Sequence, residues 1–436
     1  MPPDLPELPV PSPVAPPVVA VAVARAHRDE WARVLASTAR VTRDLDLAEE
    51  CTQDAFAKAL EAWPQSGVPH RPGAWLTTVA ANRARDVIRR EVHGRRLLPL
   101  LVDDEPEQGP DPDALALAEA AQVVPDDRLR LVFTCCHPAL ARESQVALTL
   151  RLICGLSTTD VARAFLVREA TMAARITRAK KKIAAARIPY RVPQPADLPE
   201  RVHAVADVIH LVFTTGHDAP SGDALVRQDL VDSAIRMARM LRELLPGESA
   251  VTGLLALMLL VDARSATRVD EHGDVVLLPD QDRSRWDRAM IEEGLALVTE
   301  ALTAAPPDRY AVEAAIAAVH AEAATWDDTD WEQVVGLYDV LERLWPSPVV
   351  QLNRAVAVGL RDGPAAGLHE IERLRDEPAL ATYPYLEAAR ADFLARLGRW
   401  DESAAAYEEA LLLAGNGVES TFLRRRLADA RAHRHA

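Results

Sequence analysis

A run of basic and hydroxyl side chains between residues 171 and 182 offers the clearest chemistry in the chain. Apolar residues recur at helical spacing from Leu156 to Phe165 and again from Met172 to Ile183, with a break near Val167. This pattern predicts a helix-turn-helix, whose second helix would present a cationic edge to a DNA major groove. An ordinary amphipathic helix with a solvated face is the alternative. The edge comprises Thr171, Arg175, Arg178, Lys180, Lys181 and Lys182.

A second basic block, residues 71–96, carries seven arginines against two acids. Apolar spacing predicts a helix from Pro72 to about His93, with Trp75 either in its core or exposed as a stacking platform. Rings, hydroxyls, amides and guanidinium groups together suit single-stranded DNA, because unstacked bases lie on rings while arginines neutralise phosphates. The polar residues are Thr77, Thr78, Asn82, Arg83, Arg85, Arg89 and Arg90.

The segment from Leu47 to Trp63 predicts a helix with one apolar and one largely acidic side. The acidic side either is simply solvated or binds a basic helix of a partner. We expect Leu47, Cys51, Ala55, Phe56, Ala59 and Leu60 to be buried. The opposite side carries Glu49, Glu50, Gln53, Asp54 and Lys58.

Two other clusters invite a metal or acid/base interpretation. Cys135, Cys136 and His137 lack the two-residue gap with which thiolates converge on zinc, so we expect buried thiols at a helix end. His210 and His217 could share a helical face with Asp218 and Asp223 nearby, but we expect Gly216 to end the helix first and favour structural roles.

The sequence lacks the motifs of common enzyme classes. It has no Gly-rich phosphate loop, nucleophile elbow or HExxH motif. The segment Asp280 to Arg283, followed by Trp286, more plausibly forms a buried polar network than a catalytic site. We therefore expect no enzymatic activity, no metal and no cofactor.

Charge is distributed unevenly along the 436 residues, a length typical of two to four domains. The formal net charge of −15 divides into +2 for residues 1–191 and −17 for the remainder. Residues 99–127 hold nine acids and no base, and they separate the two basic blocks. This arrangement predicts two nucleic-acid contact modules on a flexible tether.

We expect a soluble, cytoplasmic protein that does not contact membranes. The amino-terminal residues 1–19 are rich in proline and acids, which indicates a disordered tail and not a signal peptide. The apolar run from Leu254 to Val261 is too short to span a bilayer. Four cysteines in a chain this long do not form a disulfide framework.

From Leu198 onward the sequence predicts helices almost throughout, with a short hairpin or ordered loop between about Thr267 and Arg283 around the His272-Gly273 turn. The segment from Gly398 to Asn416 resembles the second helix of a tetratricopeptide (TPR) repeat, and Tyr385 to Leu397 would be the first. A more degenerate pair covers Val349 to Leu360 and Pro364 to Leu374. A generic helical bundle is the alternative.

In this order, the segments DLAEECTQDAFAKALEAWP, RPGAWLTTVAANRARDVIRR and RLVFTCCHPALARESQVALTLRLICGLSTTDVARAFLVREATMAARITRAKKKI resemble the DNA-binding domains of an extracytoplasmic-function sigma factor. The resemblance covers residues 22–191 and favours the subgroup with a long carboxy-terminal extension. It implies an all-α fold: a disordered tail (1–19), a sigma region 2 domain (20–97), an acidic linker (98–125), a region 4 helix-turn-helix domain (126–191) and a TPR-like or bundled extension (192–436).

The resemblance also implies partners and site residues. Core RNA polymerase would bind Glu50, Gln53, Asp54 and Phe56. The −10 promoter element would contact Arg71, Trp75, Thr78, Asn82, Arg83, Arg89 and Arg90, helped by the Ser66 to Arg71 loop. The −35 element would contact Arg168, Thr171, Arg175, Arg178, Lys180, Lys181 and Lys182.

Other functions remain open at this point. The chain could be a one-component regulator with a helical-repeat sensor domain that never engages polymerase, or an enzyme with an appended DNA-binding module. The extension could bind a regulatory protein or ligand, screen the basic surface, or hold the two sigma domains in register. We favour a sigma factor with a scaffolding extension.

Overall fold

The computed structural model describes residues 16–97, 127–165, 167–217, 227–271, 274–303, 307–414 and 417–433. Residues 1–15 of the expected tail, the whole expected acidic linker, Asp218, Asp223 and the His272-Gly273 turn lie outside these residues. The expectation of disorder is wrong for residues 16–19, which form the start of the first helix. The described part is helical and contains no extended strand, as the sequence predicts. Its contacts divide the chain into a first unit, residues 1–208, and a second unit, residues 209–436.

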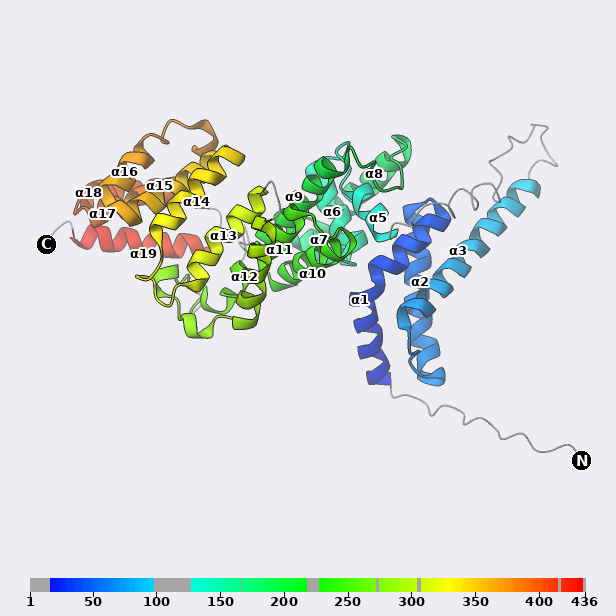
Figure 1. Cartoon of the computed structure of the whole chain (residues 1–436). Helices are drawn as coiled ribbons and strands as arrows, with labels where there is room; N and C mark the ends of the chain where they lie inside the picture. The colour runs from blue at the N-terminus through cyan, green and yellow to red at the C-terminus, as the bar shows by residue number, and fades with distance from the viewer. Residues whose placement is uncertain are drawn as a thin grey trace, which may run out of the picture. The chain divides into compact units, whose positions relative to one another are not determined.

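The first unit begins with three packed helices, α1 (Pro16–Thr42), α2 (Leu45–Ser66) and α3 (Pro72–Leu97) (Figure 1). Asp44 caps α2 by accepting hydrogen bonds from the Asp46 and Leu47 amides. Gly67 ends α2 with a positive φ of 81°, which an L side chain rarely adopts. The core between the helices includes Trp31, Leu35, Cys51, Trp63 and Leu76.

The rest of this unit contains the predicted helix-turn-helix, formed by α7 (Thr158–Ala164) and α8 (Glu169–Ala185). Ser157 caps α7, whereas the side chain of Arg168 leaves the start of α8 uncapped. The pair packs on α6 (Arg142–Leu148) and a π-helical turn (Thr149–Ile153), and both of these contact α5 (Asp127–Cys135). Their core includes Phe133, Leu148, Leu152, Met172 and Ile176.

The two helical groups of the first unit pack directly against each other. The indole Nε1 of Trp31 donates to the Leu152 carbonyl at 3.1 Å, and the Tyr190 hydroxyl donates to the Ala36 carbonyl at 2.8 Å. Gly155 has a φ of 70°, and a Cβ there would lie 2.9 Å from the His27 ring. The close approach therefore depends on glycine at this position.

Helix α9 (Leu198–His217) crosses the boundary between the units. Its first half belongs to the first unit: Arg201 donates to the Phe133 carbonyl at 2.6 Å, and Arg142 pairs with Asp207 at 2.9 Å. Our expectation that Gly216 ends this helix is wrong, since α9 continues to His217. A Cβ on Gly216 would approach Leu230 to 2.8 Å, so the glycine allows close packing.

In the second unit, α10 (Gln228–Leu244), α11 (Ser249–Asp262), α12 (Arg288–Thr303) and α13 (Arg309–Glu322) form the first bundle. Segment Ser249–Thr267 has the length and hydropathy of a membrane span, but 78% of its most apolar window is buried in the protein. It therefore serves as the central core helix and its continuation.

The connection between α11 and α12 is the expected ordered loop. An isolated antiparallel bridge joins Val269 to Val275, and short 3₁₀ turns cover Ser265–Thr267, Leu278–Asp280 and Arg283–Arg285. Arg283 donates to the His320 and Ala323 carbonyls at 2.7 and 2.6 Å, and Trp286 Nε1 donates to Thr267 Oγ1 at 3.0 Å. This is the polar network that the sequence indicates.

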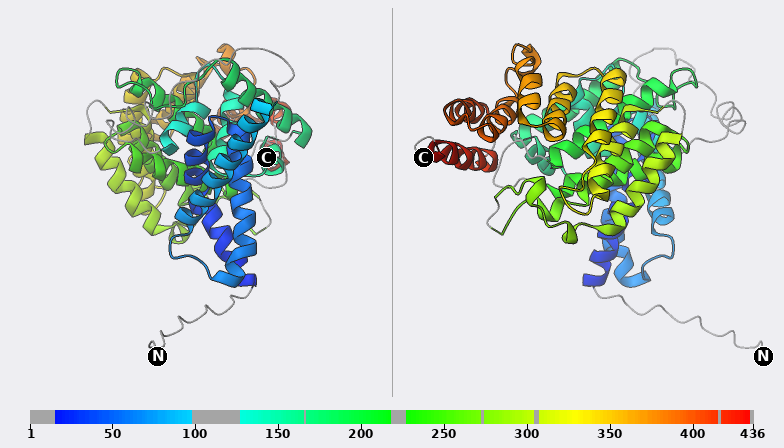
Figure 2. Two further views of the ribbon diagram at one scale, coloured as in Figure 1. Left: turned by 90° about the vertical axis from the view of Figure 1, so that its right-hand side faces the viewer. Right: turned by 60° about the vertical axis from the view of Figure 1, so that its left-hand side comes forward.

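The chain then continues through α14 (Trp331–Leu344), α15 (Pro348–Asp362), α16 (Pro364–Glu372), a 3₁₀ turn (Pro378–Leu380), α17 (Pro384–Arg396), α18 (Trp400–Leu413) and α19 (Gly417–His433). Successive helices pack on each other (Figure 2). Both predicted helix pairs are present, with Gly398 at the turn between α17 and α18 and Tyr407 and Ala410 buried. TPR-like repetition stays a prediction.

Candidate nucleic-acid interface

Helix α8 presents most of its predicted DNA-contacting residues to solvent. Arg168, Thr171, Arg178, Lys181 and Lys182 are exposed. Arg175 is partly exposed, with its guanidinium 5.7 Å from the centre of the Phe165 ring. Among the described residues, none of these cations forms an ion pair, so their charge is available for phosphates.

Lys180 corrects the prediction that it joins this edge. Its side chain is 8% exposed, and its Nζ lies 2.7 Å from Asp46 Oδ1 and 2.7 Å from Glu49 Oε2 of α2. Burial alone would lower the pKa of Lys180, but Glu49 and Asp46 together raise it above its ordinary value. In this arrangement Lys180 joins the two helical groups and does not reach DNA.

Glu49 corrects the expectation of a uniformly solvated acidic side on α2. It is 8% exposed and pairs with Arg151 as well as with Lys180. Glu49 belongs to the predicted acidic side, but Arg151 and Lys180 cover this one position, while the rest of that side stays exposed. A buried carboxylate is stable there because two cations compensate its charge.

The predicted −10 residues on and just before α3 differ from one another in exposure. Arg71, Thr78, Asn82, Arg89 and Arg90 are exposed, and Arg89 lies 3.4 Å from Asp86. Trp75 is half-buried and packs edge-to-face on Trp63, with 5.6 Å between ring centres. Arg83 donates to Asp54 Oδ2 of α2 at 2.9 Å, which connects the predicted DNA surface to the acidic face.

A polar cavity of about 540 Å³ opens beside Arg71 at the start of α3. Its lining includes Glu30, Arg33, His70 and Thr77, of which the first two come from α1. Sequence reasoning missed Glu30 and Arg33, because no local pattern connects them to a loop about forty residues later. Arg33 is exposed and Glu30 is half-buried, so neither position stands out in the sequence.

Only part of the predicted polymerase-docking set lies on the surface of α2. Glu50, Gln53 and Asp54 are exposed, whereas Phe56 is 6% exposed and packs against His27 and Trp31. Phe56 therefore supports the face from beneath. Leu60 is 51% exposed, so the expectation that it belongs to the core is wrong. The neighbouring helices do not extend over that position.

The cysteine cluster and the histidine cluster are explained by packing. Cys135 and Cys136 are buried where α5 ends, and burial raises the pKa of both thiols, that of Cys136 to about 11. His210 packs edge-to-face on Tyr310, and His217 stacks on Phe213. Among the described residues no group of three His, Cys, Asp or Glu side chains is placed to hold a metal ion.

Comparison with known families assigns residues 26–93 to sigma-70 region 2 and residues 130–183 to sigma-70 region 4. These two matches support a sigma-70 family factor with a role in promoter recognition. Residues 201–302 match a family of unknown function, DUF6596.

One relative aligns with most of the chain. A Rhizobium meliloti (strain 1021) protein, described as uncharacterized, is 46% identical over 390 residues, which cover 89% of this chain and 91% of its own. The two proteins belong to one family, whose likeness extends beyond the sigma domains into the second unit.

Proposed function

We propose that this protein is a cytoplasmic sigma factor that binds core RNA polymerase and directs promoter-specific initiation at −35 and −10 elements. The observation that carries the proposal is the presence of two helices, α3 and α8, with exposed arginines and lysines, inside the matched regions 2 and 4. A regulator that only binds DNA has no need of the first of these modules.

Region 4 would read the −35 element with α8. Arg168, Thr171 and Arg175 lie in or next to its first two turns, where side chains of a recognition helix reach base edges. Arg178, Lys181 and Lys182 would neutralise phosphates.

Region 2 would hold the unpaired −10 strand along α3. Arg71, Thr78, Asn82, Arg89 and Arg90 supply exposed polar groups, and the cavity beside Arg71 is large enough for a base. Binding an unstacked base there would offset the few kcal/mol that unstacking costs. Trp75 would fix the position of α3 by packing on Trp63, and only its exposed part would contact DNA.

Core polymerase would dock on Glu50, Gln53 and Asp54 of α2, which together form the acidic face. The test is whether purified protein co-elutes with core polymerase and directs run-off transcription. Asp54→Lys should abolish co-elution while the thermal midpoint stays nearly unchanged, because the Asp54–Arg83 pair is exposed.

Asp29→Lys is the matched control, since Asp29 is also an exposed acid but lies on α1. It should leave co-elution intact. Normal polymerase binding by Asp54→Lys, or unfolding of this variant, would show that the face is misassigned. A wild-type protein that binds promoter DNA without polymerase would instead support the one-component regulator.

The acidic extension would act as a scaffold that transcription requires. A chain ending after His217 keeps all of α9, whose first half packs on region 4 through Arg201 and Asp207. We expect this chain to lose run-off transcription even with excess core polymerase. If the shortened chain transcribes better than the full-length protein, and added salt reduces the difference, the acidic extension is autoinhibitory.

A further inference from the structure

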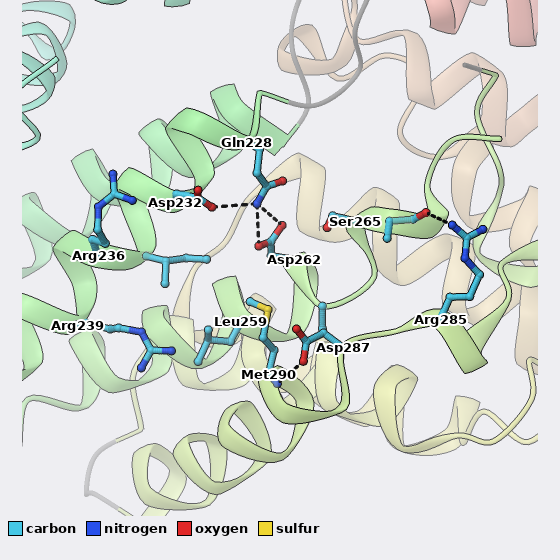
Figure 3. Close-up of a pocket in the computed structure, with 13 residues that line it drawn as sticks. Gln228, Asp232, Arg236, Arg239, Leu259, Asp262, Ser265, Arg285, Asp287 and Met290 are labelled. Atoms are coloured by element: carbon cyan, nitrogen blue, oxygen red, sulfur yellow. Dashed lines mark hydrogen bonds between the residues drawn. The ribbon is translucent and has the colours of Figure 1, made fainter. Parts of the chain in front are cut away.

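A cavity of about 670 Å³ lies in the second unit between α10, α11 and the start of α12 (Figure 3). Every residue that lines it falls between positions 228 and 290, inside the segment matched to the family of unknown function. Its volume is in the range typical of small-molecule sites.

Asp262 is the buried charge of this cavity. Its carboxylate is 6% exposed and occupies the centre of the view in Figure 3. Gln228 Nε2 lies 3.3 and 3.2 Å from its two oxygens and 3.1 Å from Asp232 Oδ1. Among the described residues no cation pairs with Asp262, and burial raises the pKa of this carboxyl group. A buried carboxylate held only by neutral donors favours a cationic ligand.

Two guanidinium groups flank this carboxylate in Figure 3. Arg236 donates to Ser233 Oγ at 2.9 Å, and Arg285 donates to the Ala266 carbonyl at 3.3 Å. In the described part of the chain neither forms an ion pair, whereas the nearby Arg239 is fully engaged by Glu293.

The lining thus combines charges of both signs that do not neutralise each other. Asp232 and Asp287 also lack ion pairs within the described ranges, although Asp287 accepts a hydrogen bond from the Met290 amide at 3.0 Å. Ile235, Leu259 and Met290 add an apolar wall. Three carboxylates disfavour a phosphate or nucleotide.

We propose that this cavity binds a small zwitterion of the amino-acid type. Its ammonium group would pair with Asp262 and Asp232, its carboxylate with Arg236 or Arg285, and an apolar side chain would lie on Leu259 and Met290. This site goes beyond the proposed sigma function, and neither stands or falls with the other.

The test uses the full-length protein and the twenty L-amino acids, each at millimolar concentration, with the thermal midpoint as readout and calorimetry for the affinity. At least one amino acid should raise the midpoint, because a ligand that binds only the folded state stabilises it. For leucine, as an example, 4-methylpentanoate lacks the amine and isoamylamine lacks the carboxylate. Neither matched analogue should reproduce the shift.

Asp262→Asn keeps the shape of the side chain and removes its charge. It should abolish the shift while the ligand-free midpoint stays equal or rises, because an uncompensated buried carboxylate is lost. Arg236→Ala and Arg285→Ala change exposed side chains, and at least one should weaken binding about tenfold or more without unfolding. Glu292→Gln, an exposed change on α12 outside the cavity, should bind normally.

Three outcomes would overturn the proposal. They are no shift with any amino acid, a shift that survives Asp262→Asn, and an equal shift with an analogue that lacks the amine. If Asp262→Asn unfolds, the two arginine variants decide the question, since unchanged affinity in both removes the carboxylate subsite.

Discussion

Helix α8 of the first unit exposes Arg168, Arg178, Lys181 and Lys182 without a carboxylate partner among the described residues. In the second unit, several arginines outside the cavity of Arg236 and Arg285 form ion pairs instead. Arg361 contacts Glu332 and Asp362, Arg390 contacts Glu372 and Glu387, and Arg399 contacts Glu402.

This difference separates two uses of the same side chain. A phosphate gains most from a cation that has no partner to displace, whereas an ion-paired arginine must first break its existing contacts. The segments on either side of residue 191 contain similar numbers of basic residues, 26 and 24. The comparison therefore predicts that DNA binding depends on pairing and not on the number of cations.

The largest effect on promoter binding should come from the double variant Arg175→Ala, Arg178→Ala on α8. We expect promoter affinity to fall more than about tenfold, because Arg175 no longer contacts bases, and the log-log salt dependence to flatten by roughly one unit, because Arg178 no longer neutralises a phosphate. Fluorescence anisotropy of labelled promoter DNA, with the protein bound to core polymerase and salt varied from about 50 to 200 mM, would measure both changes.

The matched control is Arg361→Ala, Arg399→Ala in the second unit, which removes the same charge from paired positions. Its salt dependence should equal that of the parent. An unchanged slope in a folded α8 variant would remove this helix from the DNA interface.

Lys180 and Lys181 test the comparison on adjacent residues. Lys180→Ala should destabilise the first unit by about 3 kcal/mol, because Asp46 and the buried Glu49 lose a partner, while the salt slope stays the same. Lys181→Ala should lower the slope by about one unit and leave the thermal midpoint unchanged. The reverse result would place Lys180 at the DNA.

A substitution of Arg390 tests whether an ion-paired arginine of the second unit contributes to stability and not to DNA binding. Its side chain is 12% exposed and lies 2.8 Å from Glu372 and 3.3 Å from Glu387. Arg390→Ala should lower the free energy of unfolding by about 2 kcal/mol without any change in promoter affinity. Arg361→Ala, with more exposed partners, should cost less than about 1 kcal/mol. If folded Arg390→Ala bound the promoter more weakly, ion-paired arginines would also contribute to DNA binding, and the comparison would be wrong.

The smallest effect concerns a buried group that rejects positive charge. Burial first, and then Arg264 and Arg283, lower the pKa of His320 to about 4. As pH falls below 6.5 the unfolded histidine takes up a proton while the folded one stays neutral, so stability is lost between pH 6.5 and about 4. The expected loss from pH 7.5 to 5.5 is about 1.3 kcal/mol.

Denaturant titrations at both pH values would measure this loss, and His320→Gln should reduce it. The exposed His369 of α16, replaced by Gln in the same way, supplies the control variant. An identical acid-induced loss in His320→Gln would assign the effect to other groups.

Periodicity and turn chemistry were enough to predict the helices, whereas the predicted order of the domains came from the resemblance to sigma factors. Met172, Ile176 and Ile183 repeat at the helical period and are buried on α8. The same repeat predicts the exposed side of that helix. It correctly places four of the five cations after Arg168 on that side, and the exception is Lys180. These features are local, since each depends on the residues within two or three turns.

The misplaced residues depend on contacts between distant segments. Glu49 and Lys180 are 131 positions apart, and each looks solvated within its own helix. Leu60 looks buried by periodicity, but no neighbouring helix covers it. Gly216 has the propensity to end a helix, yet close packing by Leu230 of α10 keeps it within α9.

The order of the residues alone thus predicts a helical chain with two basic modules and an acidic extension, and it predicts which helix faces are apolar. Packing between distant segments settles which charges are free, which are paired, and which line a common cavity. The physical reason is that helix formation depends on neighbours along the chain, whereas the burial and pairing of a charge depend on whatever segment packs against it.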